Sequence, residues 1–258
     1  MATSVEPVLT AAGLGVRFGG HKAVDGVTCS FMQGTLTAIV GPNGAGKTTF
    51  FNLLSGHTAA TEGDVFLFGE KITDWPASRR ARRGLGRGFQ LTNLFPNLSA
   101  HENVRLAVQS RKGAKWPLVS LWSRHSNLID EADSILARTG LEAHRDTPAR
   151  ALSHGDQRKL EVAVLTALAP KIYLFDEPTA GMSADEVPLV LDLIARLKAE
   201  GGHTILLVEH KMDVIGQLAD RVLVLHQGAL AADGDVDSVI SSDLVQQAYL
   251  GRVRSGHS

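Results

Sequence analysis

The sequence predicts an α/β fold with a parallel sheet, one strand of which leads into a phosphate-binding loop. Residues 36–40 form an apolar, strand-sized run that leads directly into a glycine-rich loop and then a helical stretch. In the last third of the chain, strand-like and helix-like segments alternate. Such alternation is typical of a parallel sheet with crossover helices.

Composition and charge narrow the class of protein. The chain has 258 residues, of which 44% are hydrophobic and 21% charged, as in a soluble globular domain with an insertion. Lys plus Arg number 26 and Asp plus Glu 27, so we expect no nucleic-acid partner. The single cysteine, Cys29, favours a reducing compartment. Because the sequence has no signal peptide and no membrane-length apolar run, we expect a cytoplasmic protein that reaches a membrane only through a partner.

The elements can be placed in order along the chain. Short strand-like pieces broken by glycines come first, and a long helical stretch with a break at 112–117 occupies the middle. We expect one domain over 1–258, with a β portion and α/β core at about 6–90 and 156–258 and a helical insertion at about 91–155. The expected strands are 8–9, 16–18, 27–31, 36–40, 64–68, 172–175, 205–208 and 222–225, and the expected helices are 47–54, parts of 91–150, 153–169, 184–199, 212–218 and 244–249.

The loop after residue 40 matches the pattern GxxxxGK[ST]. Glycines let several backbone N–H groups turn toward phosphates, and the following helix adds its positive end. Lys47 can reach the β- and γ-phosphates, and the Thr48 hydroxyl can bind Mg²⁺. The alternative is a glycine-rich turn with an exposed lysine, but the strand before it and the helix after it favour the phosphate loop. The predicted phosphate-binding residues here are Gly41, Pro42, Asn43, Gly44, Ala45, Gly46, Lys47, Thr48 and Thr49.

Two acids follow a second apolar strand. Residues 172–175 deliver Asp176 to the carboxyl end of the sheet, where ligands bind in folds of this kind. Asp176 is suited to hold Mg²⁺, and Glu177 to orient or deprotonate an attacking water. Alone, the pair could be two solvated acids at a strand end. Together with the phosphate loop, it predicts a magnesium-dependent hydrolase of a nucleoside triphosphate.

Four further features resemble the motifs of ABC ATPases, in order and over nearly the whole chain. Leu152-Ser153-His154-Gly155-Asp156 resembles the LSGGQ signature, Gln90 the Q-loop glutamine, His210 the switch histidine, and Phe18 the aromatic residue that stacks on adenine. The resemblance implies a RecA-like P-loop NTPase core, an N-terminal antiparallel β subdomain and an inserted helical subdomain.

The resemblance also implies roles for these residues. Gln90 contacts Mg²⁺ or the lytic water, and His210 hydrogen-bonds the γ-phosphate. Ser153 and the N–H of Gly155 bind ATP held by a second subunit, so the working unit is a head-to-tail dimer. The signature departs from the family pattern at His154 and Asp156, and the D-loop departs at Ser183.

A finer resemblance points to ATP-binding subunits of branched-chain amino-acid, urea and amide importers. It is carried by residues 17–24, 177–182, 208–212 and the ending Ala248-Tyr249-Leu250-Gly251. It implies integral-membrane permease partners, a second identical or paralogous ATP-binding subunit, an indirect periplasmic or secreted binding protein, and a place on the cytoplasmic face of the inner membrane. Similar endings occur in lipopolysaccharide-export ATPases, so an exporter motor stays open. A non-transport ABC ATPase is the other alternative, although the chain has one P-loop and no sustained heptads.

Two basic segments have open interpretations. Residues 111–128 carry Lys112, Lys115, Trp116, Trp122 and Arg124, which suit either a membrane or permease contact or a solvated insert. The arginine run at 79–83 is expected to be a solvated helix face rather than a phosphate-binding patch.

Overall fold

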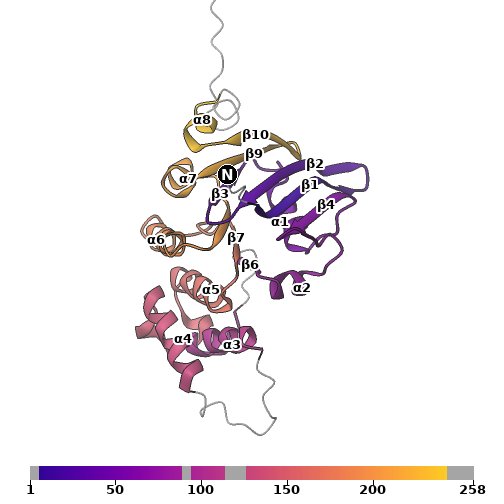
Figure 1. Cartoon of the computed structure of the whole chain (residues 1–258). Coiled ribbons are helices and arrows are strands. Elements are labelled where there is room, and N and C mark those ends of the chain that lie inside the picture. Colours follow the sequence, from indigo (N-terminus) through magenta and orange to yellow (C-terminus); the bar gives the residue numbers. More distant parts are fainter. Residues whose placement is uncertain (1–5, 89–93, 114–125, 243–258) are drawn as a thin grey trace, which may run out of the picture.

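The computed structural model describes residues 6–88, 94–113 and 126–242, and its strands form two sheets (Figure 1). The first sheet is antiparallel and has four strands in the order β2-β1-β4-β5. It confirms the expected antiparallel N-terminal portion. Its strands are β1 (Pro7–Phe18), β2 (His21–Met32), β4 (Glu62–Leu67) and β5 (Glu70–Lys71).

The second sheet has six strands in the order β10-β9-β3-β8-β7-β6. Every neighbouring pair is parallel except β10 with β9, which is an antiparallel hairpin at the edge. The predicted α/β core is therefore confirmed. Its strands are β3 (Leu36–Val40), β6 (Leu85–Gly88), β7 (Ile172–Asp176), β8 (Thr204–Val208), β9 (Arg221–His226) and β10 (Ala229–Gly234).

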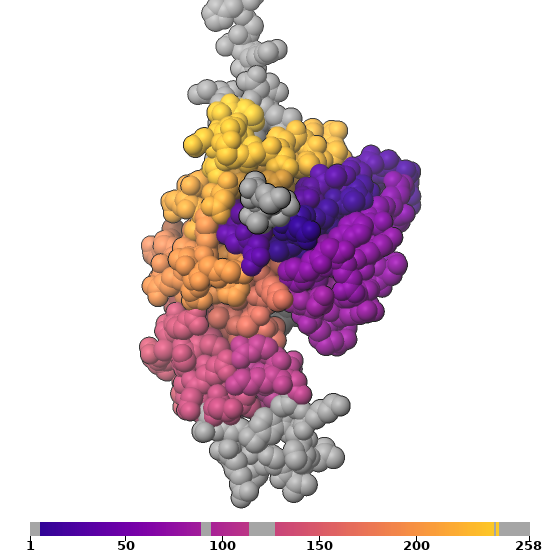
Figure 2. Space-filling model, viewed as in Figure 1, coloured from indigo at the N-terminus to yellow at the C-terminus, as the bar shows by residue number. Residues whose placement is uncertain are grey.

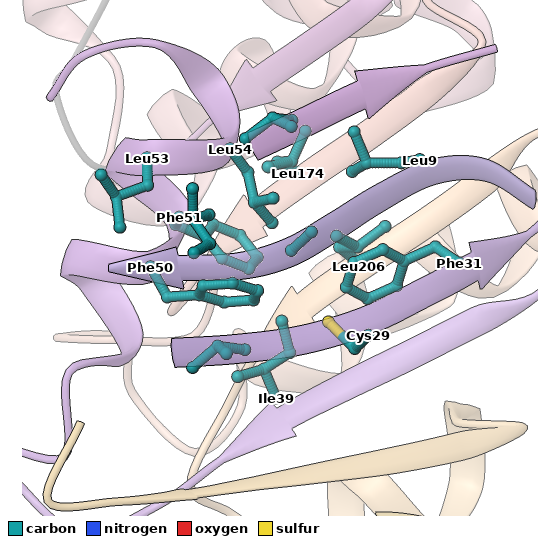
Figure 3. Packing of buried hydrophobic residues seen from close by; sticks show 14 of the residues in the cluster. Leu9, Cys29, Phe31, Ile39, Phe50, Phe51, Leu53, Leu54, Leu174 and Leu206 are labelled. Atoms are coloured by element: carbon teal, nitrogen blue, oxygen red, sulfur yellow. The ribbon is translucent and has the colours of Figure 1, made fainter. Parts of the chain in front are cut away.

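Helix α1 (Lys47–Ser55) lies between the two sheets, and its burial fixes the phosphate loop. Phe50, Phe51 and Leu54 are fully buried against residues of both sheets (Figure 3). Burying each such side chain stabilises the fold by about 1.5–3 kcal/mol. Because this core anchors the body of α1, the amino end of the helix is held at the carboxyl end of β3. The contacting sheet residues include Leu9, Cys29, Phe31, Ile39, Leu174 and Leu206.

Some of the other helices lie along the parallel sheet, and a separate helical group lies at one end of the molecule (Figures 1 and 2). These helices are α2 (Ala77–Arg82), α3 (Ala100–Arg111), α4 (Ser126–Thr139), α5 (His154–Leu168), α6 (Val187–Ala199), α7 (Met212–Leu218) and α8 (Val236–Ile240), and the 3₁₀ turns are Glu142–His144 and Ala149–Ala151. Helices α5, α6 and α7 contribute to a second core, and α7 and α8 to a smaller one. Helices α3, α4 and α5 share a further core that includes Val104, Leu136 and Leu160.

The structure corrects several predicted elements. The short N-terminal pieces are two twelve-residue strands, because register shifts let β1 continue through its glycines. Strand β6, of sequence LGRG, was not predicted. A Cβ on Gly86 would lie 2.6 Å from Cγ of Pro170, so only glycine allows this close packing. Helix α6 begins at Val187 rather than 184, α8 was missed, and the predicted helix at 244–249 lies outside the described residues.

The prediction of a solvated arginine run is wrong for Arg80. Its side chain is 2% exposed and its guanidinium donates hydrogen bonds to main-chain carbonyls, whereas Arg79, Arg82 and Arg83 are exposed. Within the described ranges, no helix is both long enough and apolar enough to cross a bilayer.

Candidate functional site

The phosphate loop connects β3 to α1, and its glycines adopt conformations that other residues avoid. Gly46 caps α1 with φ 96°, and the N–H of Phe50 donates to its carbonyl at 2.8 Å. Gly44 has φ 80°, and a Cβ placed on it would meet no atom within 4 Å and would project into open space. The loop thus keeps a concave, backbone-lined surface at the amino end of a helix, which favours an anion.

A cavity of about 370 Å³ opens over this loop. Predicted residues of the loop and Glu177 line it together, so the structure brings the phosphate loop and the proposed base into one site. His21 and Ala23 also line the cavity and were not predicted. Phe18 pairs with His21 at the β1–β2 hairpin and is 56% exposed there. The cavity is lined by His21, Ala23, Asn43, Gly44, Ala45, Gly46, Lys47, Thr48, Thr49 and Glu177.

Lys47 is the cationic group of the cavity. Its side chain is buried, and its Nζ donates to the carbonyls of Gly41 at 2.6 Å and Pro42 at 3.2 Å. Burial lowers the pKa of the Lys47 ammonium, while the nearby charges of Glu177 and Asp176 act in the opposite direction. An ammonium held against the loop in this way is suited to phosphate oxygens.

Asp176 ends β7 and is 4% exposed. Burial raises the pKa of its carboxyl, and the Arg87 guanidinium, whose Nη2 lies 2.8 Å from Oδ2, opposes the rise. Arg87 also donates to Oδ1 of Asn52 at 2.6 Å and Oγ of Ser55 at 2.8 Å, both in α1. Sequence reasoning missed Arg87, because its partners lie 32 to 89 residues away.

The donor chemistry near Lys47 fits Mg²⁺. A carboxylate at Asp176, a hydroxyl at Thr48 and the carboxylate of Glu177 are hard oxygen ligands of the kind this ion prefers. Magnesium ions also bind substrate phosphates directly, and the glycine loop offers the place for them. Gln90, the other predicted metal contact, lies outside the described residues, although β6 ends at Gly88 just before it.

Glu177 adopts a left-handed backbone conformation with φ 51°. Its N–H donates to the carbonyl of Val208 on β8 at 3.0 Å, and its own carbonyl accepts the N–H of Ala180 at 3.0 Å. A non-glycine residue held in this region stores strain, which recurs at functional sites. The conformation therefore supports the proposal that Glu177 acts in catalysis.

His210 lies two residues after the end of β8 and is exposed. Because β7 and β8 are parallel neighbours with Asp176 opposite Val208, the residues that follow both strands leave the sheet at the same edge. The structure therefore puts the predicted switch histidine and the two predicted acids at one end of adjacent strands. No described bond joins the His210 ring to Glu177, and its role toward a γ-phosphate stays a prediction.

Ser153 and Gly155 stand at the amino end of α5 and do not line the cavity described above. Ser153 caps the helix: its Oγ accepts the N–H of Asp156 at 3.1 Å and donates to Oδ2 of Asp156 at 2.8 Å. The N–H of Gly155 donates to Oε1 of Glu186 at 3.0 Å. Carboxylates of the same chain thus engage both predicted phosphate donors. His154, where the signature departs from the family pattern, is exposed.

The basic segment at 111–128 is described only at its two ends. Lys112 pairs with Glu131 at 2.7 Å, and Arg111 also contacts Glu131, so this end is tied to α4. Lys115, Trp116, Trp122 and Arg124 lie outside the described residues. The choice between a membrane or permease contact and a solvated insert stays open.

Comparison with known proteins gives one consistent family. A family model described as ABC transporter matches residues 24–180. The chain is 36% identical over 251 residues to the high-affinity branched-chain amino acid transport ATP-binding proteins BraF of Pseudomonas aeruginosa and LivG of Escherichia coli, covering 95% of this chain and 98% of each relative. Its structure is similar to the ADP conformation of MJ1267, an ATP-binding cassette of an ABC transporter, with a TM-score of 0.81, 28% identity, and coverage of 96% of this chain and 100% of that one.

Proposed function

We propose that this chain, which belongs to the ABC transporter family as its ATP-hydrolysing subunit, powers import. The proposed cargo is branched-chain amino acids, related amino acids, urea or short amides. The observation that carries the cargo class is the 36% identity, over nearly the full length, to two branched-chain amino-acid transport subunits. ATP hydrolysis as its energy source is supported by the cavity, which combines a glycine loop, a buried ammonium and a strand-end glutamate.

The triphosphate of ATP binds along 41–49 in this proposal. Backbone N–H groups of the loop and the Lys47 ammonium hold the phosphate oxygens, and exposed Phe18 stacks on the adenine. Thr48, Asp176 and Gln90 would hold Mg²⁺, which would neutralise negative charge on the nucleotide's phosphates. Arg87 keeps the carboxylate of Asp176 oriented through the ion pair at 2.8 Å.

Glu177 and His210 prepare the attack of water on the γ-phosphate. The Glu177 carboxylate orients the water and accepts its proton, because this acid lines the cavity beside the phosphate loop. His210 hydrogen-bonds the γ-phosphate from the next strand end. Positioned donors and charges of this kind lower the barrier, since they need no reorganisation as charge develops.

A second ATP-binding subunit completes the site. Ser153 and the N–H of Gly155 contact the γ-phosphate bound by the partner, in a head-to-tail homodimer or paralogous heterodimer. The support is the placement of these donors at a helix amino end outside the chain's own cavity. When the dimer closes, Ser153 must therefore release Asp156, and the Gly155 N–H must release Glu186, before each can donate to a phosphate oxygen.

The proposed partners in the membrane are integral permease subunits. The chain would sit on the cytoplasmic face of the inner membrane through them, and a periplasmic or secreted binding protein would deliver cargo. The names of the relatives, which describe ATP-binding proteins of amino-acid transport, support this arrangement.

The experiment that tests the site is Glu177→Gln. We expect the variant to bind Mg-ATP as well as the parent, to lose hydrolysis by about 10²–10⁴-fold, and to accumulate as an ATP-bound dimer. Nucleotide affinity, turnover and sedimentation measure the three effects. Glu142→Gln, an exposed acid in a 3₁₀ turn, is the matched control. Near-normal turnover in Glu177→Gln would remove Glu177 as the base.

A second experiment tests the cargo. The chain is co-purified with the permease subunits that it binds in membranes and is reconstituted with the binding protein that delivers their cargo. Leucine, urea and acetamide are then compared as stimulants of ATP hydrolysis. Stimulation by none of the three, in a complex that hydrolyses ATP, would reject the proposed cargo class while leaving the ATPase role intact.

A further inference from the structure

Glu209 is a fully buried carboxylate that the proposed mechanism does not use. Its side chain is 0% exposed, and no ion pair involves it among the residues that the structure describes. Burying a carboxylate without a cationic partner is costly, and a well-packed apolar residue would be cheaper at such a position. The hydrogen bonds that Glu209 accepts should therefore explain why an acid occupies this position.

Three hydrogen bonds satisfy this carboxylate. Oε1 accepts the hydroxyl of Thr179 at 2.5 Å, while Oε2 accepts the N–H of His210 at 3.0 Å and the N–H of Lys211 at 3.4 Å. Thr179 follows β7, and Glu209 follows β8. One side chain thus joins the loops that leave two neighbouring parallel strands.

These loops carry the two proposed catalytic groups. Thr179 is two residues after Glu177, in the turn closed by the bond from the Ala180 N–H to the Glu177 carbonyl at 3.0 Å. Glu209 directly precedes His210 and holds its N–H. Thr179 is itself 2% exposed, so water does not compete freely for its bond to Glu209.

We propose that Glu209 is a positioning residue that sets the relative placement of Glu177 and His210 through its bonds to Thr179 and the His210 main chain. The proposal rests on the catalytic roles proposed for Glu177 and His210. The strained φ of 51° at Glu177 persists only when surrounding contacts hold it, and the Glu209–Thr179 bond is one such contact. Because in-line attack tolerates little displacement, loosening this link slows hydrolysis more than it weakens nucleotide binding.

The test uses four single variants of the full chain and one double variant, which combines Glu209→Leu with Thr179→Val. Glu209→Leu removes all three acceptor bonds, and Thr179→Val removes the hydroxyl donor while keeping its shape. Glu209→Gln keeps a carbonyl for the His210 and Lys211 N–H groups and offers its amide to Thr179, so it should restore most of the activity lost in Glu209→Leu. Thr139→Val is the matched control, since Thr139 is also buried and, among the described residues, its hydroxyl bonds within α4.

We expect Glu209→Leu and Thr179→Val each to lower kcat by about 10- to 100-fold, with KM for ATP and the dissociation constant for a fluorescent ATP analogue changed by less than about 3-fold. The double variant should lose no more than the worse single variant, because both break the same link. Thr139→Val should keep kcat near that of the parent.

Three results would overturn the proposal: unchanged kcat in Thr179→Val, a loss in Glu209→Gln as large as in Glu209→Leu, or multiplicative losses in the double variant. Thr179→Val and Glu209→Gln decide the question even where Glu209→Leu does not fold. The Glu177→Gln variant, measured in parallel, distinguishes failure of the proposed catalytic role of Glu177 from failure of the proposed role of Glu209. If that variant hydrolyses normally, the proposed function of Glu177 fails; if it is inactive while Thr179→Val is fully active, only the role of Glu209 fails.

Discussion

Replacing Arg80 by methionine should destabilise the protein strongly, although the residue belongs to an arginine-rich surface helix. Its guanidinium donates to four main-chain carbonyls: Leu53 at 2.7 Å, Leu54 at 2.8 Å, Thr73 at 2.7 Å and Trp75 at 3.0 Å. Leu53 and Leu54 belong to the last turn of α1, whose carbonyls have no partner within the helix. A cation at this end also interacts favourably with the helix dipole.

The magnitude follows from opposing terms. Hydrogen bonds from a charged donor contribute about 1.5–3 kcal/mol each, and methionine would remove this donor from all four carbonyls, of which that of Leu53 keeps the N–H of Gly56 at 3.3 Å. Burial strips water from the charged guanidinium and so lowers the pKa of Arg80, and methionine would remove this desolvation cost. The net loss should be about 2–4 kcal/mol in the free energy of unfolding, or about 4–16 °C in Tm for a chain of this size.

Urea titration followed by circular dichroism measures this loss. Arg82→Met is the matched control, because Arg82 lies two positions away in the same helix and is exposed. It should change the free energy of unfolding by less than about 0.5 kcal/mol. If the two variants lose equal stability, or if Arg80→Met loses less than about 1 kcal/mol, the four bonds do not stabilise the fold as argued.

Two further predictions concern the core and the signature helix. Burial raises the pKa of the Cys29 thiol from 9.0 to about 12, so this group stabilises the fold below pH 9 and the contribution is lost as pH rises toward 12. Between pH 9 and 10 the parent should lose about 1 kcal/mol more stability than Cys29→Ala in urea titrations, and parallel losses would contradict the shift. In the Glu177→Gln background, Glu186→Gln should tighten the ATP-bound dimer roughly 2- to 10-fold by sedimentation, because it removes a negative charge from the Gly155 N–H. A weaker dimer would mean that Glu186 instead supports the signature helix.

The phosphate loop could be predicted because its information is local. Eight consecutive residues carry the glycines, Lys47 and Thr48, and the apolar strand before them fixes their place in the sheet. Asp176 and Glu177 could be predicted equally well, since an apolar strand that ends in two acids places both at the carboxyl end of a parallel sheet. The cavity that contains Lys47 and Glu177 together follows from these two local patterns.

Arg80 shows why a charge pattern alone could not predict burial. Four arginines in five residues indicate a solvated surface, and three of them are indeed exposed. The fourth is buried because the carboxyl end of α1, 26 residues earlier in the chain, lies against α2 and needs donors. Similarly, the sequence LGRG of β6 has little strand character, and its conformation depends on packing against Pro170 and Leu165.

The positioning groups were missed for a topological reason. Strands β3, β8, β7 and β6 are consecutive neighbours in the sheet, yet they lie far apart in the sequence and out of order. Their carboxyl ends bring together the phosphate loop, the Glu209–His210 pair, the Asp176–Glu177 pair and, near the end of β6, Arg87. A charged residue at the end of such a strand is ambiguous until the neighbouring strand is known, because only the neighbour supplies the partner that justifies its burial. With the order 3-8-7-6 in hand, Arg87 and Glu209 follow from the same reasoning that identified Asp176. Motifs were enough to predict some site residues, whereas the others could be found only with the strand order, which is nonlocal information.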